Sequence, residues 1–172
     1  MPKESWGDFI NINIVEMTET HARALSEWKF DGIYSFYDHN SEDVEEYMDG
    51  TYYACKNDEG ELVGNFCFGT GARVPTVEDD VYEDGFLDVG LSLRPDLCGK
   101  GLGYKFFLDG LKFACDKFNT CRFRLSVAVF NERAVKVYKK AGFYVDREVT
   151  NSYYKNKFYI MKYEMSMKCG DD

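Results

Sequence analysis

The sequence predicts a single domain over residues 1–172 of the α/β (α+β) class, with helices packed on one mixed sheet. Three observations predict this class. Several short runs are apolar and β-prone, and in one of them, residues 9–15, apolar and polar residues alternate as in a half-buried strand. The stretches between these runs carry helix caps or apolar residues at helical spacing. No internal repeat or linker divides the chain, and 172 residues, 45% of them apolar, are enough for one core.

The first half of the chain starts with a strand, two helices and a hairpin. A strand is expected over residues 9–15, where isoleucines alternate with asparagines. Thr18 suits the N-cap position of a helix that runs to about Trp28, and Ser41 that of a second, short helix that runs to about Met48. The β-prone runs 51–56 and 61–69 flank a polar Asn-Asp-Glu-Gly sequence, which predicts that they pair as a hairpin.

The second half of the chain continues this alternation. An acidic stretch without apolar periodicity, residues 71–85, is expected to be an exposed loop. It is followed by a strand at 86–93, a helix at 101–118, a strand at 123–129, a helix from Asn131 to Gly142, and strands at 143–148 and 158–165. Glycine suits the left-handed position just after a helix.

Cysteine and histidine usage argues against disulfides and metal sites. The six cysteines are scattered and lack any C-x-x-C spacing, so we expect them to be reduced. Only His21 and His39 offer imidazole, so we expect no metal. Neither a signal peptide nor a run of about 18 apolar residues is present, which favours a cytoplasmic protein with no membrane partner.

The charges are divided unevenly along the chain, within a net charge of −9. Residues 1–93 hold 5 Lys/Arg and 21 Asp/Glu, whereas residues 94–140 hold 11 and 4. This division indicates that the basic segment binds a polyanion. The acidic half either faces cationic partners or serves solubility alone. Nucleic acid is disfavoured as a partner, because the whole chain would repel a phosphate backbone.

A glycine-rich loop, Gly99-Lys100-Gly101-Leu102-Gly103, lies between a predicted strand and a predicted helix. Glycines let the backbone approach a ligand closely, and the free N–H groups at a helix start favour an anion. The spacing fits neither the Rossmann nor the P-loop fingerprint. By itself the loop therefore predicts only a phosphate-binding turn.

Two segments carry a family resemblance. Leu91-Ser92-Leu93-Arg94-Pro95, followed by Cys98-Gly99-Lys100-Gly101-Leu102-Gly103, resembles the coenzyme A signature of the GNAT superfamily of N-acetyltransferases. The segment from Asn131 to Phe143, with Tyr138 within it, resembles the second motif of that superfamily. The resemblance implies a mostly antiparallel sheet of six to seven strands with splayed fourth and fifth strands, about four helices, and acetyl-CoA as co-substrate.

The resemblance also assigns the donor site. Backbone groups of Leu91, Ser92 and Leu93 are expected to pair with the pantetheine arm, and one N–H to polarise the thioester carbonyl. The pyrophosphate is expected on Gly99, Lys100, Gly101, Leu102, Gly103 and Tyr104, with Asn131 contacting the cofactor. Cys98 stands where the family usually has Arg or Gln, and a thiol is a weak donor in support of the loop.

For catalysis, the resemblance assigns Tyr138 as the acid that protonates the departing thiolate. Asn131 and Tyr138 are two helical turns apart and project from one helix face. One branch of the family uses a Glu as base where this chain has Ser126. Another branch uses an acid on the fourth strand, which makes Asp88 the candidate base, acting directly or through water. Solvent-mediated deprotonation is the alternative.

We therefore expect an N-acetyltransferase that transfers acetyl from acetyl-CoA to a primary amine of a small molecule or a protein N-terminus. Direct attack in a ternary complex is the expected route. Aromatic residues at 28–37 and 153–154 are candidates for an acceptor pocket that suits a cationic amine. The alternative is a catalytically inactive acyl-CoA-binding sensor. The oligomeric state is open, with a homodimer among the alternatives.

Overall fold

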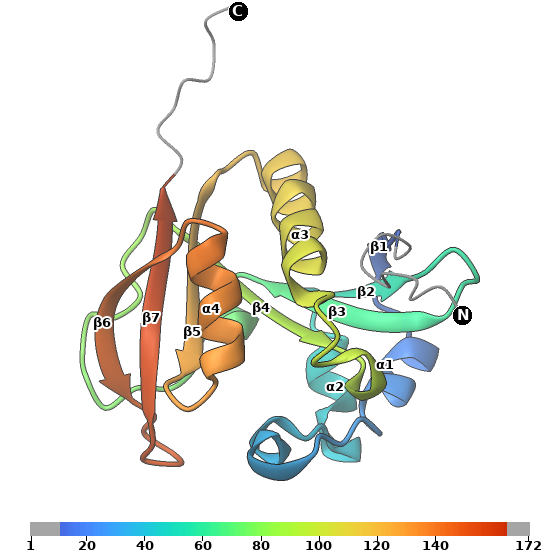
Figure 1. The fold of residues 1–172 in the computed structure, drawn as a ribbon, viewed down its shortest axis with the longest axis horizontal. Coiled ribbons are helices and arrows are strands. Elements are labelled where there is room, and N and C mark those ends of the chain that lie inside the picture. Colours follow the sequence, from blue (N-terminus) through green and yellow to red (C-terminus); the bar gives the residue numbers. More distant parts are fainter. Residues whose placement is uncertain (1–10, 165–172) are drawn as a thin grey trace, which may run out of the picture.

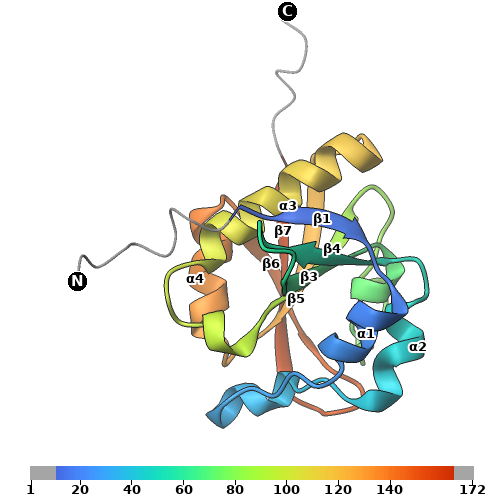
Figure 2. The ribbon, with the colours of Figure 1, turned by 90° about the vertical axis from the view of Figure 1, so that its right-hand side faces the viewer.

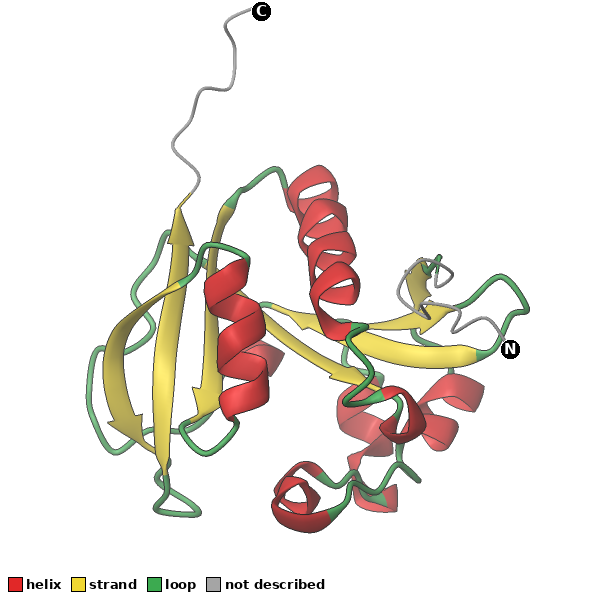
Figure 3. Cartoon of the chain, in the orientation of Figure 1, coloured by secondary structure: helices red, strands yellow, loops and turns green. Residues whose placement is uncertain are grey.

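The computed structural model describes residues 11–164, which fold around a seven-stranded sheet (Figure 1 and Figure 3). The strands are β1 (Asn13–Glu16), β2 (Tyr52–Lys56), β3 (Leu62–Phe68), β4 (Leu87–Leu93), β5 (Arg122–Ala128), β6 (Tyr144–Thr150) and β7 (Lys157–Glu164). The helices are α1 (Glu19–Leu25), α2 (Val44–Tyr47), α3 (Gly103–Phe118) and α4 (Glu132–Lys140). Parts of the predictions at residues 9, 10 and 165, and Cys169, lie outside the described residues.

The strand order is β1-β2-β3-β4-β5-β7-β6, and every neighbouring pair is antiparallel except β4–β5. The parallel pair joins only Leu87 to Phe123 and Asp88 to Arg124. Beyond that point the two strands diverge toward their C-terminal ends (Figure 1). The predicted mixed, mostly antiparallel sheet with splayed fourth and fifth strands is therefore confirmed.

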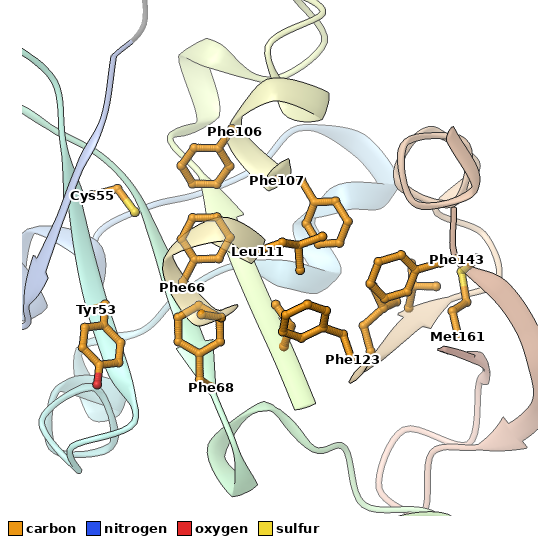
Figure 4. Close-up of a cluster of buried hydrophobic side chains, with 14 of the residues drawn as sticks. Tyr53, Cys55, Phe66, Phe68, Phe106, Phe107, Leu111, Phe123, Phe143 and Met161 are labelled. Atoms are coloured by element: carbon orange, nitrogen blue, oxygen red, sulfur yellow. The ribbon is translucent and has the colours of Figure 1, made fainter. Parts of the chain in front are cut away.

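Helices cover both faces of the sheet. Figure 2 shows α3 and α4 on one side of the strands and α1 and α2 on the other. Under α3 and α4 the main core is rich in phenylalanine, including Phe66, Phe106, Phe107 and Phe143 (Figure 4). Gly110 lets α3 approach the sheet closely, because a Cβ there would lie 2.2 Å from the Phe66 ring.

Two predicted helix ends, at Thr18 and Gly142, are confirmed, whereas α1 ends at Leu25, earlier than the end expected near Trp28. The Thr18 hydroxyl accepts a hydrogen bond from the His21 N–H and starts α1. Gly142 follows α4 with a φ of 101°, in the left-handed region. The prediction for Ser41 was wrong by one residue. Asn40 is the N-cap, because its side chain and that of Asp43 form a reciprocal capping box.

The acidic stretch at 71–85 is not simply an exposed loop. Val81 is 5% exposed and packs with Val149, Phe158 and Ile160 beneath β6 and β7. The Tyr82 hydroxyl fixes the stretch by donating to the Val74 carbonyl at 2.7 Å. The sequence did not predict this, because isolated apolar residues in an acidic segment carry no periodic signal.

Three further observations concern the described residues. Cys55, Cys67, Cys98, Cys115 and Cys121 are not in disulfide bonds. Among residues 11–164, no helix has the length and apolar content needed to cross a membrane, and no three His, Cys, Asp or Glu side chains are grouped so that they could bind a metal ion.

Candidate active site

The divergence of β4 and β5 leaves backbone hydrogen-bonding groups facing the space between them. In an antiparallel ladder, alternate residues bond to the same neighbour. Asp88 of β4 and Arg94, the residue after β4, bond to the β3 side, through Gly69 N–H and Val63 C=O. The intervening odd-numbered residues, among them Leu91 and Leu93, therefore direct their N–H and C=O groups toward β5. After Asp88 no β5 residue pairs with them.

The same alternation corrects one expected contact. Ser92 has the parity of Asp88 and Arg94, so its backbone groups face Asn65 on β3 and not the open edge. Its hydroxyl donates to the Asn65 side chain. Leu91 and Leu93 can thus pair with a ligand between the strands through their backbone groups, whereas Ser92 cannot.

The glycine loop has the conformation that a phosphate site requires. Gly99 and Gly101 have φ values of 72° and 77°, which side-chain-bearing residues rarely adopt. Leu102 is 3% exposed, so its side chain anchors the loop in the core. No side chain caps the start of α3 at Leu102. The N–H groups of the first turn are therefore oriented for an anion, as the helix dipole favours.

Several side chains surround this loop. The Cys98 thiol donates to the Leu93 carbonyl at 3.4 Å and so ties the loop to the end of β4. Burial raises the pKa of this thiol, and the charge of Arg133 only partly offsets the shift. Arg133 also lies 4.2 Å from the centre of the Tyr34 ring. Lys140 lies 4.2 Å from the ring centre of Tyr104, which is on the first turn of α3. Cationic groups of α4 therefore flank both sides of the loop.

Tyr138 lies on α4, and Asn131 is the N-cap that precedes this helix. The Asn131 side chain caps the helix by accepting from the Ala134 N–H at 3.2 Å. Tyr138 packs against Phe107 of α3, with 4.8 Å between ring centres. Burial raises the pKa of the Tyr138 hydroxyl far above its usual range, and the neighbouring Tyr37 phenol adds to the shift. Tyr138 therefore stays protonated at neutral pH, as a proton donor must.

The position of Asp88 does not suit its expected role as a base. It is 2% exposed, and the Arg124 guanidinium donates to both of its oxygens, at 2.6 and 2.8 Å. Arg73 donates to it as well, at 2.9 Å. Val89 packs in the core under α3, so the preceding Asp88 points to the opposite face of the sheet from Tyr138. These contacts favour a structural role for Asp88.

Of the aromatic candidates for an acceptor pocket, Trp28 and Phe30 pack against His39 between α1 and α2. Phe36, on the 3-10 helix η2 (Gly32–Tyr37), lies in edge contact with Tyr154 of the β6–β7 loop, with 5.1 Å between ring centres. Tyr153 is exposed next to Tyr154. The second group therefore includes exposed rings, whereas Trp28 is buried.

The structure adds one polar residue that sequence reasoning had grouped only with the aromatics. The Tyr37 hydroxyl accepts from the Ala128 N–H at 3.3 Å and from the Asn131 side chain at 3.4 Å. Because 94 residues separate Tyr37 from Asn131, no local pattern could have indicated this contact.

Comparisons with known proteins agree with this geometry. A family model described as "Acetyltransferase (GNAT) domain" matches residues 11–144. Comparison with curated protein sequences gave no significant match.

Solved structures with a similar fold include an aminoglycoside acetyltransferase, AAC(6')-Ib, in complex with coenzyme A, with a TM-score of 0.69 and 21% identity. That comparison covers 89% of this chain and 94% of the other. A chimera of the spermidine N-acetyltransferase SpeG from Vibrio cholerae with hSSAT has a TM-score of 0.68 at 16% identity, covering 88% and 93% of the two chains. A GNAT-family acetyltransferase from Bacillus anthracis has a TM-score of 0.67 at 15% identity, covering 90% and 97%.

Proposed function

This chain belongs to the GNAT acetyltransferase family, whose members use acetyl-CoA, and we propose that it acetylates a primary amine of a cationic small molecule by direct attack in a ternary complex. The single observation that carries the proposal is the open edge between β4 and β5, with the glycine loop at the end of one strand and Tyr138 on the helix after the other. A protein N-terminus is the other acceptor that the sequence leaves open.

The donor half of the proposed site is formed by residues that this chain positions for an extended, anionic ligand. Backbone groups of Leu91 and Leu93 face the open edge and supply the partners that a missing strand would have supplied. Gly99 to Tyr104 would hold the pyrophosphate, since glycines and an uncapped helix start create an anion site. Asn131 lies at the end of β5, where its second amide hydrogen can contact the cofactor.

In the proposed reaction, the amine nitrogen forms a bond to the acetyl carbonyl carbon and the bond from that carbon to sulfur breaks. A backbone N–H on the open edge of β4 polarises the carbonyl. The Tyr138 hydroxyl gives its proton to the departing thiolate and regains one from solvent, while the amine loses one proton before it attacks and a second as the amide forms. The raised pKa of Tyr138 fits this role, because the phenol remains protonated over the whole working range.

The remaining question is which group removes the proton from the attacking amine. Asp88 is unsuited to take it, because three donors already occupy its oxygens and it is buried. Ser126, where one branch of the family has a Glu, contacts the Tyr82 hydroxyl at 3.3 Å. We therefore propose that water accepts the proton, so that activity increases with pH toward the pKa of the acceptor amine, about 10.

A cationic acceptor is supported by the charge of the segment that follows α1 and carries η2 and α2. Residues 27–49 hold eight Asp/Glu and one lysine. Such a surface raises the local concentration of cations. The structural neighbours include proteins that act on spermidine and on aminoglycosides, so both kinds of polyamine are suitable first acceptors. Acetylation in the cytoplasm, and a single domain over residues 1–172, remain predictions from the sequence.

A thiol-release screen tests this function. The purified chain and acetyl-CoA are incubated with polyamines, aminoglycosides, free amino acids and short peptides, and free coenzyme A is measured. Release that depends on a polyamine or an aminoglycoside supports the proposal. Release only with peptides moves the acceptor to a protein N-terminus. Acetyl-CoA binding without release with any amine supports an acyl-CoA sensor instead.

A further inference from the structure

The Tyr37 hydroxyl fills a hydrogen-bonding position on the open edge of β5. Val129 N–H bonds to Lys157 of the β7 side, so by alternation the backbone groups of Ala128 face away from β7, toward the space that β4 has left. The Tyr37 hydroxyl accepts from the Ala128 N–H there, at 3.3 Å. A backbone group that would otherwise lack a strand partner is thus satisfied by a side chain from η2.

The same hydroxyl contacts Asn131. One hydrogen of the Asn131 amide nitrogen goes to Tyr37 at 3.4 Å, while the Asn131 side-chain oxygen accepts from the Ala134 N–H. The two contacts fix which way the carboxamide faces, and they leave its second N–H for a ligand. Asn131 is the residue that the family resemblance places against the cofactor.

A second contact holds η2 to the same end of α4. The Tyr34 ring lies against the Arg133 guanidinium, 4.2 Å from ring centre to guanidinium carbon. Tyr37 itself is held by Phe36 and Phe130, with ring centres 5.1 and 5.8 Å away. The segment expected on the acceptor side is therefore attached, through ring packing and hydrogen bonds, to the residues expected on the donor side.

We infer that Tyr37 is a positioning residue, which orients the Asn131 carboxamide toward acetyl-CoA and links the acceptor segment to the donor site. The inference rests on the proposed function for its effect on turnover. Its effect on acetyl-CoA binding can be measured whether or not an acceptor is known. The hydroxyl of Tyr37 need not touch the reacting atoms for this role.

A double-mutant cycle tests the inference, with Tyr37→Phe, Asn131→Ser and the double variant compared with the wild type. Phenylalanine keeps the ring that packs against Phe130, and serine keeps an N-cap on α4 while removing the amide nitrogen. Calorimetry gives the affinity for acetyl-CoA, and thiol release gives kcat and KM for each substrate. Tyr144→Phe, on an exposed part of β6, is the matched control for loss of a tyrosine hydroxyl.

We expect each single variant to weaken acetyl-CoA binding by about threefold to tenfold, the value of one hydrogen bond. The double variant should be no weaker than Asn131→Ser alone, because the two groups act through one contact. Tyr144→Phe should bind as the wild type does. Melting curves establish that the variants are folded. Since Tyr37→Phe and Asn131→Ser each remove the same contact, one folded single variant is sufficient to test whether that contact supports acetyl-CoA binding.

Three results would overturn the inference. Unchanged acetyl-CoA affinity in folded Tyr37→Phe would mean that the contact does not position Asn131. Losses that multiply in the double variant would mean that the two residues act independently. An increase in the acceptor KM alone would make Tyr37 an acceptor-binding residue. If the wild type binds acetyl-CoA but acetylates no amine, the proposed function fails while the binding cycle still decides the role of Tyr37.

Discussion

The Arg124 guanidinium of β5 donates hydrogen bonds to both carboxylate oxygens of Asp88 on β4, at the last position where the two strands pair. Arg124 is fully buried and its third contact is to the Glu83 carbonyl, at 2.8 Å. This ion pair closes the narrow end of the space between the strands. It thereby holds β4 and β5 together at the point from which they diverge.

Asp88→Asn should destabilise the fold and leave the chemistry of folded molecules largely intact. The substitution leaves Arg124 buried without an opposite charge, which costs about 3 kcal/mol. Urea denaturation measures this loss, and kcat is measured at a temperature where the variant is folded. Asp96→Asn is the control, because the pair of Asp96 with Arg94 is largely exposed and should contribute less than about 1 kcal/mol. A stable Asp88→Asn protein with kcat reduced about 100-fold would restore Asp88 as the base.

Gly101→Ala should weaken acetyl-CoA binding. Its φ of 77° is unfavourable for alanine by about 1 kcal/mol, and relief of that strain would turn the N–H groups of the loop away from a phosphate. The KM for acetyl-CoA should increase at least fivefold. Gly60→Ala is a matched control, since Gly60 has a φ of 80° in the β2–β3 turn and likewise no atom near its missing Cβ. If the two variants have the same KM, the loop does not bind the cofactor.

Tyr138→Phe should retain acetyl-CoA binding and lose turnover. The hydroxyl alone is removed, and the ring keeps its packing against Phe107 and Phe143. A missing general acid lowers kcat by about 100-fold. Calorimetry for binding and thiol release for kcat separate the two effects. A kcat equal to that of the wild type would remove the acid role.

Stability should fall at alkaline pH. Burial raises the pKa values of Tyr52 and Tyr138 far above 10, their ordinary value. In the unfolded chain these phenols lose their protons near pH 10, so the stabilising contribution is complete below that pH and is lost above it. Each group removes about 1.4 kcal/mol per pH unit from the free energy of unfolding above pH 10.

Urea denaturation between pH 8 and 11 measures this slope. Tyr52→Phe removes one of these groups, so its stability should decline less steeply with pH than that of the wild type. Parallel declines in the two proteins would show that Tyr52 does not contribute.

The sequence predicted the features that are encoded locally. The strands, the Thr18 cap, the left-handed Gly142 and the glycine loop each depend on a few consecutive residues, and the structure confirms them. The family motifs extended this to the divergence of β4 and β5.

What the sequence could not predict depends on contacts between distant residues. Arg124 and Asp88 are 36 residues apart, and Tyr37 and Asn131 are 94 apart, so only the folded chain brings them together. Ser92 was misjudged for a related reason. The backbone groups of a strand residue face either one neighbouring strand or the other. The choice depends on register, and register is set by the whole sheet.

The measurement that tests the central claim most directly follows the acetyl group with and without an acceptor. The protein is mixed with acetyl-CoA alone, and then together with an amine found active in the screen. Intact-protein mass, free thiol and acetylated amine are measured. Direct transfer to an amine predicts no thiol release and no added mass on the protein until the amine is present, and then one acetylated amine for each thiol. An acetyl group attached to the protein before the amine is added, for example on Cys98, would contradict it.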